Sequence, residues 1–440
     1  MPSLLCSRIA ALLALCLALL LAATPAAAQK RGGTLRLYHN DTPPSTSLHE
    51  ESTIASATPF AAIFNNLVVF DPAKPHESLD TVIGDLAESW SWDAGNTRLT
   101  FKLRQGVKWH DGQPFTAKDV QCTWRMLIGR DQTADFRRNP RKIWYANLQD
   151  VSINGDYEAT FELSEPQPSL PVLLASAFSP VYPCHVPQQL MRTKPVGTGP
   201  FKFVEYKRGD SIRLVRNPDY FKTDRPYLDE ITFRVIDSRA TRVLAFSTGE
   251  FDITFPSDLT VALTRDVKAR TPNAVCELTK TGTQVNLLVN RVNPPFDNPD
   301  IRKAMSLVLD RSAFNTLLIE GQGLVGGAML PRPAGEWGMP QEMVAQLTGG
   351  DAEKKVAEAR AIMEKLGYSD AKPLPIKIQT RNLQSYRDPA VILIDQLKKI
   401  HISGELDILE TPRWYTRLAK KDYTIGLNIT GVSVDDPDAN

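Results

Sequence analysis

The sequence has 440 residues, and 51 Lys and Arg against 50 Asp and Glu give a formal net charge of +1. This balance excludes the basic excess that nucleic-acid-binding and anionic-membrane-binding proteins use, so we expect no nucleic-acid partner. At about 100 to 200 residues per domain, the chain has room for two or three domains.

The first 28 residues have the pattern of a secretory signal peptide. Arg8 precedes an uninterrupted apolar run over residues 9–21, and three alanines end at Ala28. The run is shorter than the roughly 20 residues that span a membrane, and small residues precede a signal-peptide cleavage site. We therefore predict cleavage near Ala28 and a periplasmic location. The alternative is a membrane anchor.

Hydrophobic periodicity predicts the elements of the first hundred residues. We expect a strand over residues 34–38, then a polar loop over 39–47, and a helix over 60–70. Residues 98–104 alternate strictly between apolar and polar side chains, which predicts a half-buried strand. The alternation resumes at Val107 and Trp109 and ends at an Asp-Gly turn, which predicts a second short strand.

A helix and a hairpin are expected next. Thr116, with Asp119 three residues later, has the spacing of a capping box and predicts the start of a helix. Asn154-Gly155 separates two alternating runs between residues 151 and 163, which predicts a β-hairpin. The later chain alternates predicted strands near 212–214, 231–235, 376–378, 406–408 and 423–429 with predicted helices over 240–247, 298–309, 312–321, 351–366 and 393–400.

Two stretches carry a resemblance to a known family. Residues 86–127 contain the order strand, strand, Asp-Gly turn and capped helix, and residues 197–253 contain Gly-Thr-Gly-Pro, Asn-Pro-Asp-Tyr, Pro-Tyr-Leu-Asp-Glu-Ile and Gly-Glu-Phe-Asp-Ile. The chain thereby resembles the extracytoplasmic solute-binding proteins of family 5, the peptide- and nickel-type receptors of ABC importers. The signature lies in the scaffold and says little about the ligand.

The resemblance implies an α/β, two-lobed periplasmic-binding-protein fold, type II-like, with mixed sheets flanked by helices and an extra inserted subdomain. We expect residues 29–58 and 190–289 to form the first lobe, 59–189 the inserted hairpin-rich subdomain, and 290–440 the second lobe. Family members continue beyond the Asp436-Pro437 pair. We therefore expect that a C-terminal part is missing and that the 440-residue chain folds poorly or closes imperfectly.

The resemblance also suggests where a ligand binds. In the peptide-binding branch an aspartate holds the peptide's amino end, in a segment that often begins with Trp; the matching positions here are Ser433 and Thr430. Serine cannot neutralise a buried ammonium. Either Asp435 substitutes for it, or the ligand lacks a free amino end, which we favour.

Other candidates come from residue type. Arg413 and Arg417 offer guanidinium forks for a ligand carboxylate, with solvated surface arginines as the alternative. The resemblance adds Asn40, because the loop after the first strand often faces the cleft in periplasmic receptors. The remaining candidates are the aromatic residues Tyr145, Trp414 and Tyr415, for which a place in the core is the alternative.

Motifs for catalysis and cofactor binding are absent from the sequence. We find no nucleophile elbow, phosphate loop, metalloprotease helix or dinucleotide fingerprint, and the six histidines have no ligand spacing. Pro200 removes an amide donor from Gly-Thr-Gly-Pro, so this segment is a turn. We expect His110 to be solvated, and we expect no metal, no cofactor and no catalytic residue.

Three cysteines, Cys122, Cys184 and Cys276, lie outside the predicted signal peptide. An odd number permits at most one disulfide. Their spacings match no metal site, and we favour buried free thiols over a disulfide.

The sequence therefore predicts a monomeric periplasmic substrate-binding component of an ABC importer. It would capture a peptide or peptide-like solute by hinge closure and deliver it to a permease in the inner membrane. A non-peptide solute, such as an opine, an oligosaccharide or a metal chelate, is the alternative. A secreted hydrolase, or a sensor or chaperone built on the same lobes, is a further alternative.

Overall fold

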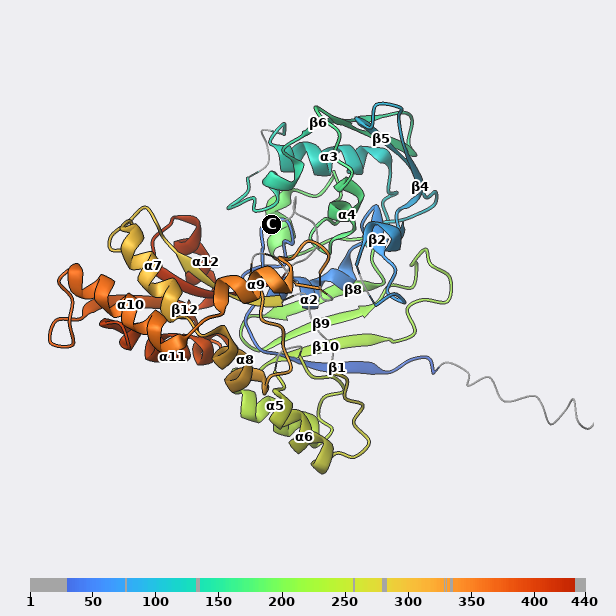
Figure 1. Ribbon diagram of the computed structural model, residues 1–440. Coiled ribbons are helices and arrows are strands. Elements are labelled where there is room, and N and C mark those ends of the chain that lie inside the picture. The colour runs from blue at the N-terminus through green and yellow to red at the C-terminus, as the bar shows by residue number, and fades with distance from the viewer. Residues whose placement is uncertain are drawn as a thin grey trace, which may run out of the picture.

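The computed structural model describes residues 30–75, 77–131, 135–255, 258–278, 283–327, 329, 331–332 and 335–431. The predicted signal peptide, Ser433 and Asp435 lie outside these residues. Three four-stranded sheets, each with its own helices, dominate the described chain (Figure 1). Within it, no helix combines the length and the apolar character needed to cross a membrane.

The central sheet has the strand order β1-β10-β9-β8, in which β1 runs parallel to β10 and the other neighbours are antiparallel. Its strands are β1 (Thr34–His39), β8 (Phe201–Lys207), β9 (Ser211–Arg216) and β10 (Glu230–Val235). Ile212, Leu214 and Phe233 alternate along their strands and are buried, as predicted. They form a core with Phe60 and Ile63, at the end of α2 (Ile54–Phe60) and in η1 (Ala61–Ile63).

A second, fully antiparallel sheet has the order β4-β5-β7-β6 and packs against α3. The elements are β4 (Ala87–Trp92), β5 (Arg98–Leu103), α3 (Ala117–Ile128), β6 (Leu148–Ile153) and β7 (Glu158–Leu163). The predicted capping box is confirmed, because the Thr116 N–H donates to Asp119 Oδ2 (2.9 Å) and the Thr116 side chain accepts in return. The predicted hairpin is confirmed in the pairing of β6 with β7.

The third sheet has the order β11-β14-β12-β13 and carries most of the later helices. Its strands are β11 (Thr283–Val289), β12 (Leu374–Arg381), β13 (Ile402–Leu409) and β14 (Ile425–Gly431), and the helices are α7 (Pro299–Val308), α8 (Arg311–Ile319), α9 (Gln341–Thr348), α10 (Ala352–Lys365), α11 (Gln384–Lys398) and α12 (Thr411–Ala419). The Asn298 side chain accepts from Asp300 N (2.9 Å) and Pro299 takes the first helical position of α7, as predicted.

Shorter elements connect these sheets. They are β2 (Val68–Phe70), η2 (Leu79–Thr81), β3 (Val82–Gly84), η3 (Lys142–Tyr145), α4 (Leu170–Ala175), η4 (Gln188–Arg192), α5 (Arg239–Ser247) and α6 (Val261–Arg270). The strands β2 and β3 pair with each other, and α5 and α6 lie below the central sheet in Figure 1.

Three large clusters of buried apolar side chains coincide with the three sheets. They support a division into a first lobe, an inserted subdomain and a second lobe, which we propose with two changes of boundary. Phe60, Ile63 and Phe64 belong to the core of the first lobe rather than to the insert. The strand β11, expected in the first lobe, pairs with β14 in the sheet of the second lobe, so the chain crosses before residue 283 rather than near 290.

Two predicted elements are wrong. The helix expected over residues 60–70 ends at Ile63, because the Ile63 carbonyl accepts a hydrogen bond from Gly199 N (2.8 Å) instead of continuing the helix; Phe64 and Leu67 are nevertheless buried. The short strand expected at Val107 and Trp109 is a single bridge between Lys108 and Pro114. Proline has no N–H with which to extend the ladder.

The Gly-Thr-Gly-Pro turn is packed against η1 with no space for a side chain at either glycine. A Cβ on Gly197 would lie 1.9 Å from the Ile63 carbonyl oxygen, and one on Gly199 would lie 2.4 Å from the Ile63 carbonyl carbon. His110 joins this contact. Its ring Nε2 lies 2.9 Å from the Gly199 carbonyl oxygen, and its backbone N–H donates to the Gly197 carbonyl (2.8 Å). The expectation that His110 is solvated is therefore wrong. The glycines of this motif allow the turn to pack closely against η1.

The preference for free thiols is also wrong, because Cys122 and Cys184 form a disulfide. Segments distant in sequence meet here: Cys184 N donates to Asp119 Oδ1 (2.8 Å), and Tyr182 N donates to the Thr123 hydroxyl (2.9 Å). A spacing of 62 residues does not reveal such a contact. Cys276 has a free thiol.

Buried histidines predict an acid-sensitive fold. Burial lowers the pKa of His49 to about 3 and of His110 to about 4, below the usual value near 6.5. Each histidine therefore contributes full stability above about pH 6.5, and that contribution falls by roughly 1.4 kcal/mol per pH unit as the pH drops toward the folded-state pKa. We expect urea unfolding at pH 7, 6 and 5 to show a falling free energy of unfolding. The His49→Gln variant should show a shallower fall, and parallel profiles would contradict this account.

Candidate ligand-binding site

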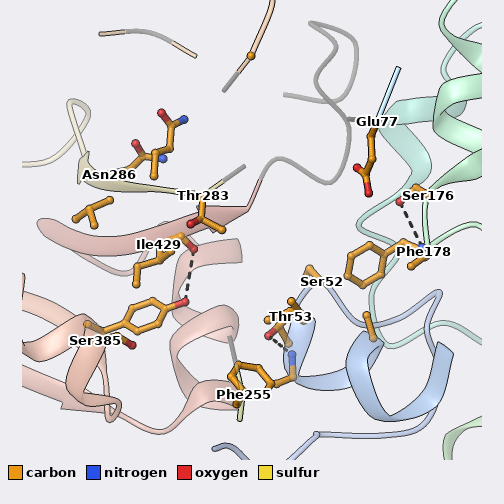
Figure 2. Close-up of a pocket in the computed structure, with 18 of the residues that line it drawn as sticks. Ser52, Thr53, Glu77, Ser176, Phe178, Phe255, Thr283, Asn286, Ser385 and Ile429 are labelled. Atoms are coloured by element: carbon orange, nitrogen blue, oxygen red, sulfur yellow. Dashed lines mark hydrogen bonds between the residues drawn. The ribbon is translucent and has the colours of Figure 1, made fainter. Parts of the chain in front are cut away.

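A large cavity of about 2690 Å³ lies between the lobes. One wall comes from the first lobe and the insert, with Ser52, Thr53 and Phe178 (Figure 2). The opposite wall comes from the second lobe, with Asn286 and Ile429 (Figure 2). Its volume exceeds the roughly 300 to 1,000 Å³ of a typical small-molecule pocket. The cavity can hold a solute larger than a single amino acid.

The second-lobe wall is built on the paired strands β11 and β14 and on α8 with the described residues that follow it. Leu427 and Ile429 of β14 line the cavity, and Asn428 between them does not. This alternation follows from the two-residue period of a strand. The partner of Ile429 across the ladder is Val285, which also lines the cavity. Thr430 lies one residue after Ile429, on the opposite face of β14, and is not among the lining residues.

Apolar side chains are exposed at the cavity. Ile54 is 56% exposed, Ile143 is 72% exposed and Val285 is 45% exposed, and all three line it. Covering such side chains is worth about 25 cal/mol per Å² of apolar surface removed from water. The walls therefore favour a solute with apolar groups.

An ionic cluster joins the two lobes beside the cavity. Arg381, at the end of β12, forms an ion pair with Asp41, which follows β1 in the first lobe. The Thr411 hydroxyl donates to the same Asp41 oxygen (2.7 Å), and Arg381 Nη1 donates to the Tyr386 hydroxyl (2.7 Å). The Arg381 side chain is 4% exposed and that of Asp41 is 11% exposed, so the pair is shielded from water.

A second buried acid at the cavity is already neutralised. Asp85 Oδ1 lies 2.5 Å from Lys222 Nζ, while Asp85 Oδ2 accepts from Asn65 Nδ2 (2.9 Å) and Asn66 N (3.1 Å). Its carboxylate is therefore occupied by protein groups, and we do not assign it to a ligand ammonium.

Arg141 differs from these paired charges. It is 6% exposed and lines the cavity, its Nη2 donates to the Glu51 carbonyl (3.2 Å), and its Nε has no hydrogen-bond partner. The guanidinium lies 4.0 Å from the Phe178 ring centroid and 4.9 Å from that of Trp144. Burial lowers the pKa of Arg141 to about 10, so the side chain remains charged at neutral pH.

The residues proposed from the sequence lie in different places. Asn40 lies on the wall of the cavity, and so does Tyr415. Tyr145 is buried in the insert, with its hydroxyl 2.9 Å from that of Ser179, and is not a lining residue. Trp414 is fully buried against the backbone of Gly426, where a Cβ would lie 2.4 Å from the indole.

The two arginines proposed from α12 do not face the cavity. Arg413 is exposed, and Arg417 Nη1 forms an ion pair with Asp407 (2.9 Å). Neither is a lining residue. Ser433 and Asp435 are not placed, since they follow the last described residue.

Sequence reasoning missed Arg141, Phe178 and Arg381. The sequence around a buried arginine does not show whether the arginine has a carboxylate partner. That depends on which acidic side chains the folded chain pairs with other residues. The exposure of Ile143 beside Trp144, which is buried, is equally a property of the folded surface. Among the described residues, no group of three or more His, Cys, Asp and Glu side chains is arranged to hold a metal ion.

Two α/β lobes around a large cavity, with an extra subdomain in the first lobe, define a two-lobed periplasmic binding protein. The chain belongs to the bacterial extracellular solute-binding proteins, family 5: the model described as "Bacterial extracellular solute-binding proteins, family 5 Middle" matches residues 81–440.

Similar proteins include the oligopeptide-binding protein AppA of Bacillus subtilis, 29% identical over 360 residues that make up 77% of this chain and 63% of AppA. The periplasmic oligopeptide-binding protein OppA of Haemophilus influenzae is 26% identical over 75% of this chain and 63% of that protein. The chain thus spans about three fifths of the length of these relatives. A crystal structure of Haemophilus influenzae OppA in complex with RPPGFSPFR superposes with a TM-score of 0.81, at 21% identity, covering 93% of this chain and 82% of the other, which confirms the predicted fold.

Proposed function

We propose that this protein is the substrate-binding component of an ABC importer and that its solute is a peptide or a peptide-like molecule. The observation that carries the proposal is the cavity of about 2690 Å³ between the two lobes, with apolar side chains exposed on both walls. Family membership and the peptide-binding relatives support the same function.

The proposed mechanism is hinge closure. A solute that contacts both walls gains its full set of contacts only when the lobes are close together, so binding shifts the population toward the closed state. The closed monomer would then dock on a permease in the inner membrane. This role requires a periplasmic location after removal of the predicted signal peptide, and it requires no catalysis.

Mass spectrometry of bound solutes tests the proposal. Protein purified from periplasm is denatured, and the released small molecules are compared with those from a periplasmic protein of another class. We expect short peptides or a peptide-like compound to be enriched. Recovery of an opine, a glycan or a metal chelate would replace the peptide assignment. Absence of any solute, together with turnover of peptides, esters or glycosides, would favour a hydrolase instead.

A further inference from the structure

We propose that Arg141 is the anchor for a carboxylate of the bound solute, and that an apolar group of the solute lies next to this carboxylate. The inference rests on the proposed function of the cavity and adds the chemistry of one end of its ligand. It follows from the isolation of a buried positive charge at the cavity wall.

The isolation of Arg141 is unusual for a buried side chain. A guanidinium has five N–H donors, and one hydrogen bond, to the Glu51 carbonyl, is formed by this side chain in the described structure. No carboxylate oxygen of the described residues lies within ion-pairing distance of it. A buried charge without a partner is destabilising. Arg141 lines the cavity, so a solute bound there can supply the missing counter-charge.

The acids near Arg141 are committed to other arginines. Glu51 forms an ion pair with Arg138 and accepts from the Ser45 hydroxyl (2.9 Å). Glu50 accepts a bidentate pair of hydrogen bonds from Arg192, at 2.8 and 2.9 Å. Because each carboxylate already has a strong partner, neither forms an ion pair with Arg141, and Glu51 attracts it only from a distance. Arg138 and Arg192 thus each have a carboxylate partner, and the guanidinium of Arg141 has none among the described residues.

The surroundings of Arg141 favour an organic acid over a small inorganic anion. Phe178 and Trp144 lie against the guanidinium, and Phe178 lies at the cavity in Figure 2. Ile143, two residues along the chain, and Ile54 expose apolar surface to the same cavity. A planar guanidinium pairs with a carboxylate through two parallel hydrogen bonds, while the isoleucines would cover an apolar group attached to it. The carboxyl end of a peptide with an apolar last residue has this chemistry, and so does another apolar organic acid.

An experiment that combines a substitution at Arg141 with a change of the ligand's carboxylate tests this role. The probes are synthetic tripeptides ending in leucine or phenylalanine, each as the free acid and as the C-terminal amide. We expect amidation to weaken binding to the wild-type protein at least tenfold and to have little effect on the Arg141→Met variant, since the partner of the carboxylate is gone. The Arg141→Lys variant should fall between them, because it keeps the charge and loses the fork. Lys142→Ala, which removes an exposed neighbouring charge, should resemble the wild type.

Two further measurements separate this role from a structural one. Without solute, Arg141→Met should unfold at the same temperature as the wild type or higher, because it removes an unpaired buried charge. Solutes released from periplasmically purified wild-type protein should carry carboxylates and should be at least tenfold depleted from the variant; this arm also covers acids that are not peptides. Equal binding of free acid and amide by the wild type, or a lower unfolding temperature of Arg141→Met, would overturn the inference. If the wild type retains a solute and the variant retains as much, this inference alone fails; if the wild type binds neither tripeptides nor any solute, the proposed function fails with it.

Discussion

Replacement of Asp41 by asparagine is expected to lower the free energy of unfolding by about 3 kcal/mol, a large share of a typical protein's stability. The substitution keeps the shape of the side chain and removes the charge that compensates Arg381 between the lobes. Arg381 is then buried with hydrogen bonds to Tyr386 and Thr411 but without a counter-charge. Urea unfolding measures the loss. Small-angle scattering should also detect a larger radius of gyration, because the pair joins the two lobes.

The pair between Arg31 and Asp224 is the matched control. Its atoms lie 2.7 Å apart, but both side chains are more than half exposed, so water and salt screen the interaction. Asp224→Asn should therefore change the free energy of unfolding by less than about 1 kcal/mol. If both asparagine variants lost the same small amount, the connection between the lobes would rest on other contacts.

The second large effect is expected from the disulfide between Cys122 and Cys184. It closes a loop of 62 residues, and loop-closure entropy gives a stabilisation of about 4 kcal/mol for a loop of this length. The double variant Cys122→Ala, Cys184→Ala should lose about this amount in urea unfolding. Cys276→Ala removes the free thiol and should leave the free energy of unfolding nearly unchanged.

Alkylation provides the chemical check on the disulfide. Protein that is unfolded without a reductant should be labelled at Cys276 and at neither Cys122 nor Cys184. Labelling of all three residues in protein from an oxidising compartment would mean that the pair is reduced, and the double variant should then match the wild type.

Elements defined by local pattern were predictable from the sequence. The alternation along β5, the capping box of α3 and the Asn-Gly turn between β6 and β7 each specify their structure within a few residues. The resemblance to the family supplied what these patterns lack, namely how the elements assemble into lobes.

Features that depend on distant contacts were not predictable. The helix after Phe60 ends because Gly199, far along the chain, takes the Ile63 carbonyl. The strand β11 belongs to the second lobe because β14 pairs with it. Neither partner can be inferred from the residues beside the element it determines.

The candidate site was predictable only in outline. Asn40 was placed at the cavity by analogy with related receptors, and it lies there. Trp414 and Tyr145 were chosen as large aromatic side chains, yet each fills a core. Residue type alone does not distinguish an aromatic ring that lines a cavity from one that packs against Gly426 or Trp124.

The position of the disulfide limits how the molecule can open. The helix α3 contributes Trp124 to the core of the insert and Met126 to the core of the first lobe, and the disulfide ties this helix to the segment after Tyr182. A covalent bond and a shared helix at the junction should make the insert and the first lobe one rigid body. The proposed hinge motion would then have a single axis, between that body and the second lobe, and both walls of the cavity would separate in one movement.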